Sequence, residues 1–242
     1  MEKEDVKIVE KGVLERPIVV VGLPDVGLVG FISAMHLIKQ LNMEQVGWVE
    51  SDLLPPIVFI HKGNINEAIR LYQSEGIVLV TSEIPIPEPL ISPLSRSLVD
   101  WAIKKEAKFL VTLGGVPVPN RLEIEKPEHF IIATDEQSKE VADRLNFEML
   151  QEGAIVGVYA SILSMGKKRK LPAIAILAQC FSNYPDPGAA ASTIEALSKI
   201  VGREISVEEL IKKSEDLRVQ RRELMLKTSR NLRQIGKSQE LE

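Results

Sequence analysis

Apolar runs without polar alternation mark four places along the chain where strands are expected. The runs are rich in β-branched residues, and each ends at a glycine, serine or proline turn; they cover 18–21, 77–80, 109–113 and 173–177. A strand that is apolar on both faces must be covered on both sides, which is typical of a parallel sheet flanked by helices. The pattern therefore predicts buried, mostly parallel strands.

Helical spacing of apolar residues separates several of these runs. Residues 28–41 and 95–105 place apolar side chains three to four positions apart, and further helices are expected over 135–145, 154–163 and 189–200. Asp135 is a candidate N-cap, and Asp186 can cap the last of these helices with Pro187 at its first position. A repeated unit of strand, turn and helix predicts an α/β fold.

Three further segments predict that the sheet is mixed. Residues 57–61 and 67–73 flank Lys62-Gly63-Asn64, which predicts an antiparallel hairpin with glycine in the turn. Residues 46–49 and 129–133 are weaker strand candidates. We expect one α/β domain whose mixed, largely parallel sheet is flanked by helices.

The last 40 residues differ in character from the rest. Leucines stand seven residues apart at positions 210, 217 and 224, and the stretch 218–237 holds seven basic residues against one acidic residue. This pattern predicts a core domain over 1–204 and a projecting helical arm and tail over 205–242. We expect Leu210, Leu217, Leu224 and Leu232 to need a partner surface.

Composition excludes several classes of protein. The net charge of −4 gives no overall positive field for nucleic acid, and the basic segment holds no aromatic residue, so RNA binding by it is a weaker alternative. One cysteine, Cys180, and three histidines make a multi-cysteine zinc site impossible, and Cys180 is expected to be a buried apolar residue. Without an apolar leader or a membrane-length apolar run, we expect a cytoplasmic protein that needs no cofactor or metal.

The strongest local motif is Gly22-Leu23-Pro24-Asp25-Val26-Gly27-Leu28-Val29-Gly30, between the first strand and the first helix. Leu28 and Val29 stand where a Walker loop needs lysine and serine or threonine, which excludes that loop. A dinucleotide fingerprint would need glycine at Pro24, although Gly27, Gly30 and Glu50 fit its remainder. A glycine turn built for packing is the favoured interpretation.

Carboxylates at the ends of the strands suggest an enzymatic alternative. Asp25, Asp52, Glu83 and Gly114-Gly115-Val116-Pro117 are expected along one crevice at the carboxyl edge of the sheet. An enzyme of the nucleoside-phosphorylase or hydrolase kind would hold phosphate at the start of the first helix and use Glu83 or Asp25 as its acid–base group. Arg121 and Arg96 are the nearest candidates for anion ligands.

Four motifs in this order resemble the proteasome assembly chaperone family in its archaeal and bacterial form, over about residues 10–235. They are the segment from Gly22 to Gly30, Gly114-Gly115-Val116-Pro117, Gly153-Ala154-Ile155-Val156-Gly157 and Tyr184-Pro185-Asp186-Pro187-Gly188-Ala189-Ala190-Ala191. The resemblance implies a fold related to purine nucleoside phosphorylases, used without a catalytic site. It also implies homo-oligomers, of which a tetramer is one form, that engage proteasome α subunits.

The chain departs from this family at its end. Some relatives carry a tyrosine as the next-to-last residue of a tail that enters pockets of the α ring, whereas Leu241 stands there in this chain. Contact with a partner is therefore predicted through the arm, and the partner-binding candidates are Leu224, Arg230, Leu232, Arg233, Ile235 and Leu241. The glycine and proline motifs are predicted to serve folding; their residues are Gly22, Pro24, Asp25, Gly27, Gly30, Gly114, Gly115, Pro117, Asp186 and Pro187.

Overall fold

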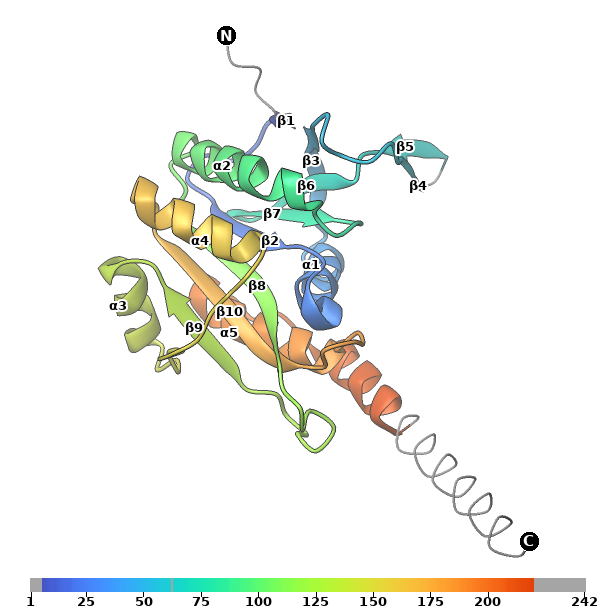
Figure 1. The fold of residues 1–242 in the computed structure, drawn as a ribbon, viewed down its shortest axis with the longest axis vertical. Coiled ribbons are helices and arrows are strands. Elements are labelled where there is room, and N and C mark those ends of the chain that lie inside the picture. The colour runs from blue at the N-terminus through green and yellow to red at the C-terminus, as the bar shows by residue number, and fades with distance from the viewer. Residues whose placement is uncertain (1–5, 62, 220–242) are drawn as a thin grey trace, which may run out of the picture.

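The computed structural model describes residues 6–61 and 63–219. Eight strands form one sheet (Figure 1): β1 (Lys7–Glu10), β2 (Ile18–Gly22), β3 (Glu44–Glu50), β6 (Ile69–Ser74), β7 (Ile77–Ser82), β8 (Phe109–Pro117), β9 (His129–Ala133) and β10 (Ala173–Cys180). Their order across the sheet is β1-β3-β6-β7-β2-β8-β10-β9. Strands β4 (Phe59–His61) and β5 (Asn64–Asn66) pair separately as a hairpin.

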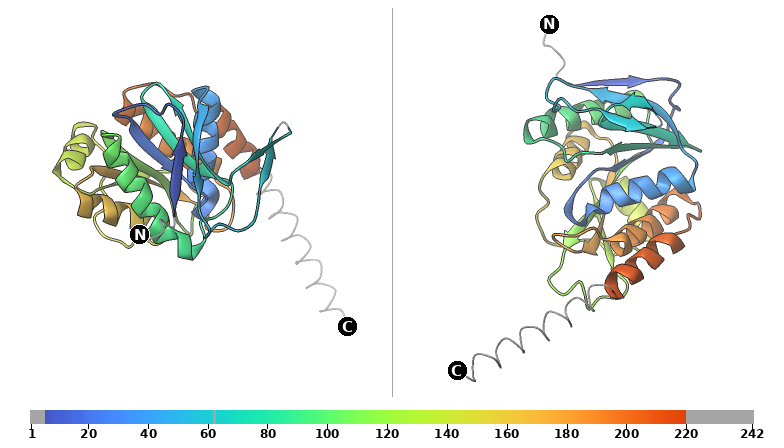
Figure 2. Two further views of the ribbon diagram at one scale, coloured as in Figure 1. Left: turned by 90° about the horizontal axis from the view of Figure 1, so that it is seen from above. Right: turned by 90° about the vertical axis from the view of Figure 1, so that its right-hand side faces the viewer.

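Helices cover both faces of this sheet, as the right-hand view of Figure 2 shows. They are the 3-10 turn η1 (Val26–Leu28), α1 (Val29–Gln40), α2 (Glu88–Lys104), α3 (Glu136–Arg144), α4 (Val158–Arg169) and α5 (Pro187–Val201). A further helix covers 208–219. In the described part of the chain, no helix has both the length and the apolar character that crossing a bilayer requires.

The centre of the sheet confirms the four strands predicted from apolar runs. Strands β7, β2, β8 and β10 are mutually parallel neighbours. Successive residues of β2 face opposite ways: Val19 and Val21 pack in the cluster with α2 and α4, and Val20 packs in the cluster with α1 and α5. All three valines are fully buried, which explains why the run shows no polar alternation.

The outer strands make the sheet mixed, as expected. Strands β6, β3 and β1 continue it in antiparallel steps on one side, and β9 pairs antiparallel with β10 on the other. The predicted hairpin partners were wrong, because β4 pairs with β5, whereas β6 joins β3 and β7. Ile69 and Leu71 of β6 are fully buried in the main sheet, a burial that a projecting two-stranded hairpin cannot offer.

Two predicted helices have different starting points in the structure. Helix α2 begins at Glu88 rather than 95 and contains Pro93, and its early turns are held by the fully buried Leu90 and Leu94. Helix α4 begins at Val158 rather than 154, because Gly157 has a φ of 82° and cannot continue a right-handed helix. The predicted N-caps are confirmed: Asp135 accepts from the Ser138 N–H and Asp186 from the Ala189 N–H.

The segment after α5 packs against the domain at its start. Ile205 and Leu210 are buried in the cluster that α1 and α5 form, and His36 Nε2 lies 2.7 Å from the Ser206 carbonyl oxygen. The expectation that Leu210 needs a partner surface was therefore wrong, because α1 and α5 already supply one. The domain boundary at 204/205 remains a prediction.

Candidate functional site

The carboxyl ends of β2, β8 and β10 bring together the four motifs on which the family resemblance rests. The turn from Gly22 to Gly30 follows β2, Gly114 and Gly115 lie near the end of β8, and the turn before α5 follows β10. Gly157 caps α4 and thereby places Tyr159 against the first turn. We call this arrangement the strand-end cluster.

Asp25 lies at the centre of the strand-end cluster. Its Oδ1 accepts a hydrogen bond from the Gly30 N–H at 3.0 Å, and its Oδ2 accepts one from the Gly115 N–H at 2.8 Å. Burial raises the pKa of Asp25 to about 7, although these backbone donors act to lower it. Its carboxyl group therefore occupies the start of α1, where the enzymatic alternative would place phosphate.

Two glycines of this turn are required by its geometry. Gly27 has a φ of 66°, and a Cβ there would lie 3.0 Å from Cys180 Cβ. A Cβ at Gly30 would lie 2.5 Å from the Leu113 carbonyl oxygen and 2.6 Å from that of Leu23. At both glycines, neighbouring strands and turns already occupy the space that a side chain would need, which supports the predicted packing role.

Tyr159 was not predicted from the sequence. Its buried hydroxyl accepts from the Leu23 N–H at 2.9 Å and donates to the Leu23 carbonyl at 3.0 Å, so it satisfies the backbone directly after β2. Burial raises the pKa of this phenol well above its usual value. In the sequence, the only local sign of this role is the position of Tyr159, two residues after the Gly157 that caps α4.

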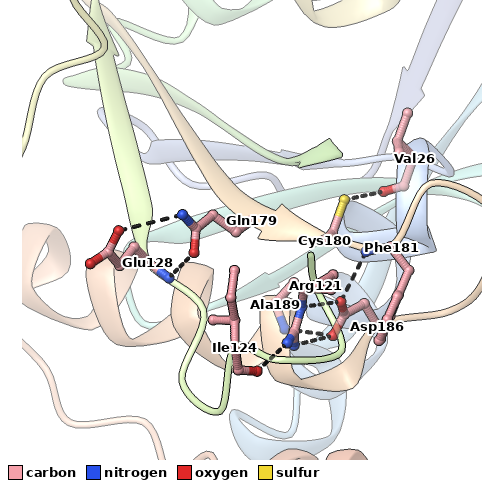
Figure 3. Close-up of polar contacts among 9 residues, drawn as sticks. All are labelled: Val26, Arg121, Ile124, Glu128, Gln179, Cys180, Phe181, Asp186 and Ala189. Atoms are coloured by element: carbon pink, nitrogen blue, oxygen red, sulfur yellow. Dashed lines mark hydrogen bonds and ion pairs between the residues drawn. The ribbon is translucent and has the colours of Figure 1, made fainter. Parts of the chain in front are cut away.

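A buried ion pair completes the strand-end cluster (Figure 3). Arg121 donates from Nε to Asp186 Oδ2 at 2.7 Å and from Nη2 to Asp186 Oδ1 at 2.9 Å. Asp186 also accepts from the backbone N–H groups of Phe181 and Ala189. Arg121 and Asp186 are 2% and 1% exposed, so the guanidinium weighed as an anion ligand is held by an internal carboxylate.

Cys180 is buried beside this ion pair, as expected for an apolar role. Its Sγ lies 3.7 Å from the Val26 carbonyl oxygen (Figure 3), and burial raises the pKa of the thiol to about 12. A thiol with so high a pKa is a poor nucleophile near neutral pH. Pro117 pairs with Cys180 in the register of β8 and β10.

The single crevice expected from the sequence does not form. Glu83 contacts Arg70 and His61 instead of the strand-end cluster, with His61 Nε2 at 2.8 Å from Glu83 Oε1. Asp52 lines a separate hollow beside β4 and β5, to which Asp25, Glu83 and residues 114–117 do not contribute. Arg96 is exposed on α2. The order of the strands and the projection of the hairpin thus distribute these groups between separate sites.

The predicted partner-binding residues lie outside the described part of the chain. They are Leu224, Arg230, Leu232, Arg233, Ile235 and Leu241. Within residues 6–61 and 63–219, no three histidine, cysteine, aspartate or glutamate side chains gather into a possible metal site.

Comparison with known proteins gives matches over nearly the whole chain. The sequence profile of the PAC2 family matches residues 19–225. An uncharacterised Methanocaldococcus jannaschii protein, MJ0106, is 30% identical over 238 residues, which cover 97% of this chain and 96% of that protein.

Two solved structures from Pyrococcus furiosus share the fold. The monoclinic form of PbaA, an archaeal homolog of proteasome-assembly chaperone, has a TM-score of 0.84 at 28% identity and covers 97% of each chain. PbaB, an archaeal proteasome activator, has a TM-score of 0.79 at 24% identity and covers 92% of this chain and all of its own.

Proposed function

This chain belongs to the PAC2 family, and on that basis we propose that it is an ATP-independent chaperone or adaptor that binds proteasome α subunits and assists assembly of the core particle. The resemblance to the proteasome assembly chaperones, first seen in four motifs, is confirmed by the family match and by PbaA. The observation that carries the proposal is the similarity to PbaA along almost the whole of both chains.

The strand-end cluster supports a protein that works by binding rather than by catalysis. The places that a phosphorylase would use for its anion are taken by internal groups, since Asp25 accepts from the Gly30 N–H in the first turn of α1 and Asp186 holds Arg121. A substrate phosphate would have to displace a carboxyl group that accepts two backbone hydrogen bonds. We therefore infer that the glycine motifs serve to stabilise the fold.

The proposed contact with α subunits lies in the basic segment of the chain. Arg230 and Arg233 would pair with acidic groups at a pocket rim, and Leu224, Leu232, Ile235 and Leu241 would supply apolar contacts. The seven basic residues against one acidic residue over 218–237 favour an acidic partner surface. We further propose that the protein acts as a homo-oligomer.

The test is co-migration of the purified chain with recombinant archaeal proteasome α subunits in size-exclusion chromatography with light scattering. The truncated form should end at Val219, because ending it at Ile205 would remove Leu210 from the core. We expect the full chain to co-migrate and the truncated chain to migrate alone. Failure of the full chain to associate with α subunits would overturn the proposed function.

Charge-reversal variants locate the contact more finely. We expect the double variant Arg230→Glu with Arg233→Glu to raise the Kd for α subunits about tenfold or more, since two attractive contacts become repulsive. Lys167→Glu with Lys168→Glu, a pair of exposed basic residues on α4, is the matched control and should leave binding unchanged. Equal losses in both variants would show that only overall charge matters.

The enzymatic alternative has an independent test. Thermal unfolding of the full chain is measured with phosphate, nucleosides or NAD singly and with phosphate and a nucleoside together, because a ligand at 100 times its Kd adds about 2.7 kcal/mol to stability. We expect the melting temperature to stay unchanged with each compound. A clear rise with phosphate and a nucleoside together would favour the phosphorylase alternative.

A further inference from the structure

We propose that the hollow beside the β4–β5 hairpin binds a short extended segment of a partner protein that carries both aliphatic and basic side chains. This hollow lies between the end of β3, the loop 51–58 and strand β5, and we call it the acidic hollow. The inference goes beyond the proposed contact of the basic segment with α subunits. It does not depend on that contact, because the acidic hollow lies on other elements of the chain.

Exposed aliphatic side chains surround the acidic hollow. Five of them stand within one stretch of the sequence, and they are Leu53, Ile57, Val58, Ile60 and Ile65. Ile57, Val58 and Ile65 line the hollow itself, which encloses about 330 Å³. That volume lies at the lower end of the range for small-molecule pockets, so it suits a few side chains of a partner better than a whole cofactor. An apolar patch rimmed by polar groups is typical of a site for another protein.

The charges around the hollow all have one sign. Its lining includes the carboxylates of Glu50, Asp52 and Glu67 and, among the described residues, no basic side chain. Glu50 pairs with Lys7 at 3.5 Å, but both side chains are at least half exposed, so this ion pair is weak. Glu67 forms no ion pair with any described residue. The hollow therefore combines an apolar floor with carboxylates that can accept a basic residue of a partner.

The hairpin supplies a backbone edge beside the hollow. It projects from the body of the domain (Figures 1 and 2), and within the described chain β4 and β5 pair only with each other. His61 of β4 lies 2.8 Å from Glu83, which anchors the hairpin to the main domain. Ile65 and Asn66 of β5 line the hollow, so a partner strand paired with β5 lies beside it. Such strand addition gains affinity from backbone hydrogen bonds and specificity from side chains that enter a pocket.

A partner with basic residues fits this surface better than a second copy of the chain or a nucleic acid. Two facing copies of the hollow would bring the carboxylates of Glu50, Asp52 and Glu67 toward their like, and this repulsion costs free energy. Phosphate groups of a nucleic acid would meet the same repulsion. In the proposed segment, isoleucine, valine or leucine enters the hollow, and lysine or arginine reaches the rim with its aliphatic stem on apolar surface.

The experiment measures the binding of a fluorescent octapeptide of alternating lysine and isoleucine to the full chain by fluorescence anisotropy. Two control peptides have the same length, one with glutamate in place of lysine and one with serine in place of isoleucine. We expect saturable binding of the lysine–isoleucine peptide. Each control peptide should have a Kd at least about tenfold higher, because each lacks one of the two kinds of contact.

Two charge variants locate the site of this peptide. Glu67→Lys should raise the Kd of the lysine–isoleucine peptide about tenfold or more, since an attractive contact becomes repulsive. Glu152→Lys is the matched control, because Glu152 is an exposed acidic residue that lines a different hollow, beside β9 and α4. It should leave the Kd unchanged. Circular dichroism checks that both variants keep their helix content.

Each other outcome overturns the inference. Absence of saturable binding, or one Kd for all three peptides, shows that the hollow does not select basic and aliphatic side chains together. An unchanged Kd in Glu67→Lys places the peptide elsewhere, and equal losses in Glu67→Lys and Glu152→Lys show that only overall charge matters.

The basic segment of this chain is the alternative occupant. A synthetic peptide of residues 218–237 is therefore measured in the same way against wild type and Glu67→Lys. If it binds wild type more tightly than the lysine–isoleucine peptide and loses affinity in Glu67→Lys, the hollow holds the chain's own basic segment and the inference of a partner protein is overturned. None of these measurements contains α subunits, so their failure is distinguishable from failure of the proposed function.

Discussion

The strand-end cluster and the β4–β5 hairpin differ in how fully their groups are satisfied within one chain. In the strand-end cluster, Asp25, Tyr159 and the ion pair of Arg121 with Asp186 are each bonded to groups far away in sequence. In the hairpin, Ile60 and Ile65 contribute large apolar surfaces to solvent. The first region completes the fold, whereas the second leaves surface available for another molecule.

This contrast explains why the part of the fold that resembles a ligand site is the less promising place for a partner. A cleft at the carboxyl ends of parallel strands is where α/β proteins usually bind ligands. Here the glycine turns bring backbone and side chains so close that an added Cβ at Gly27 or Gly30 would meet neighbouring atoms. Variants of these two regions should therefore differ in stability as much as their contacts do.

The largest loss of stability is expected from Arg121→Ala. Removing the guanidinium leaves the buried Asp186 carboxylate without its ionic partner, which costs about 3–5 kcal/mol in free energy of unfolding. Urea denaturation monitored by circular dichroism measures this loss. Arg169→Ala, which breaks the exposed ion pair with Asp100, should cost under about 1 kcal/mol. Similar losses in the two variants would contradict the special role of the buried pair.

Asp25 should make stability depend on pH. Burial raises its pKa to about 7 in the folded protein, against 3.8 for an ordinary aspartate, so the folded state binds a proton more tightly and its stability falls as pH rises from about 4 to 7. The pKa difference corresponds to a fall on the order of 4 kcal/mol. Asp25→Asn should flatten this dependence, whereas the exposed Asp143→Asn should retain it.

Urea unfolding at several pH values between 4 and 8 measures this effect. The slope of stability against pH is the readout, because the amide of Asp25→Asn cannot accept from both Gly30 and Gly115 and so loses one backbone hydrogen bond at every pH. An unchanged slope in Asp25→Asn would show that another group titrates in this range.

Gly27→Val tests the close packing of the glycine turn. Gly12 has the same φ of 66° as Gly27 but has no atom within 4 Å of the added Cβ, so Gly12→Val isolates the backbone strain. Gly27→Val should lose about 1–3 kcal/mol more than Gly12→Val, because its side chain also meets Cys180 and Phe181. Equal unfolding midpoints would show that only the backbone conformation matters.

The smallest effect on stability is expected in the hairpin. Ile60→Thr keeps a β-branched side chain on a residue that is 71% exposed, so the free energy of unfolding should change by less than about 0.5 kcal/mol. The measurement is made at concentrations low enough that the unfolding midpoint no longer depends on protein concentration. A loss of several kcal/mol would show that Ile60 packs within its own chain.

Much of the fold could be predicted because it follows from short stretches of sequence. The four central strands lack polar alternation and are rich in apolar residues, since both faces of these strands are buried. The caps Asp135 and Asp186 bond to N–H groups three residues away, and such contacts depend only on local spacing. Sequence also indicated that the turn from Gly22 to Gly30 serves packing.

Other parts were decided only by the order of the strands and the packing of distant segments. Tyr159 meets Leu23 across 136 residues, and Asp25 meets Gly115 across 90. The pairing of β6 with β3 and β7, rather than with the hairpin, depends on which sheet buries Ile69 and Leu71. Likewise, the sequence shows that Leu210 is apolar but not what covers it. The placement of α1 and α5 buries it within its own chain.

The class of the fold, its central strands and the family can thus be predicted from the amino-acid sequence, because they depend on local patterns and on motifs in a fixed order. Which polar groups are satisfied internally, and which apolar surfaces remain exposed, is visible only in the folded chain. Burial and hydrogen bonding between residues far apart in sequence depend on the relative positions of whole strands and helices, which no local pattern specifies.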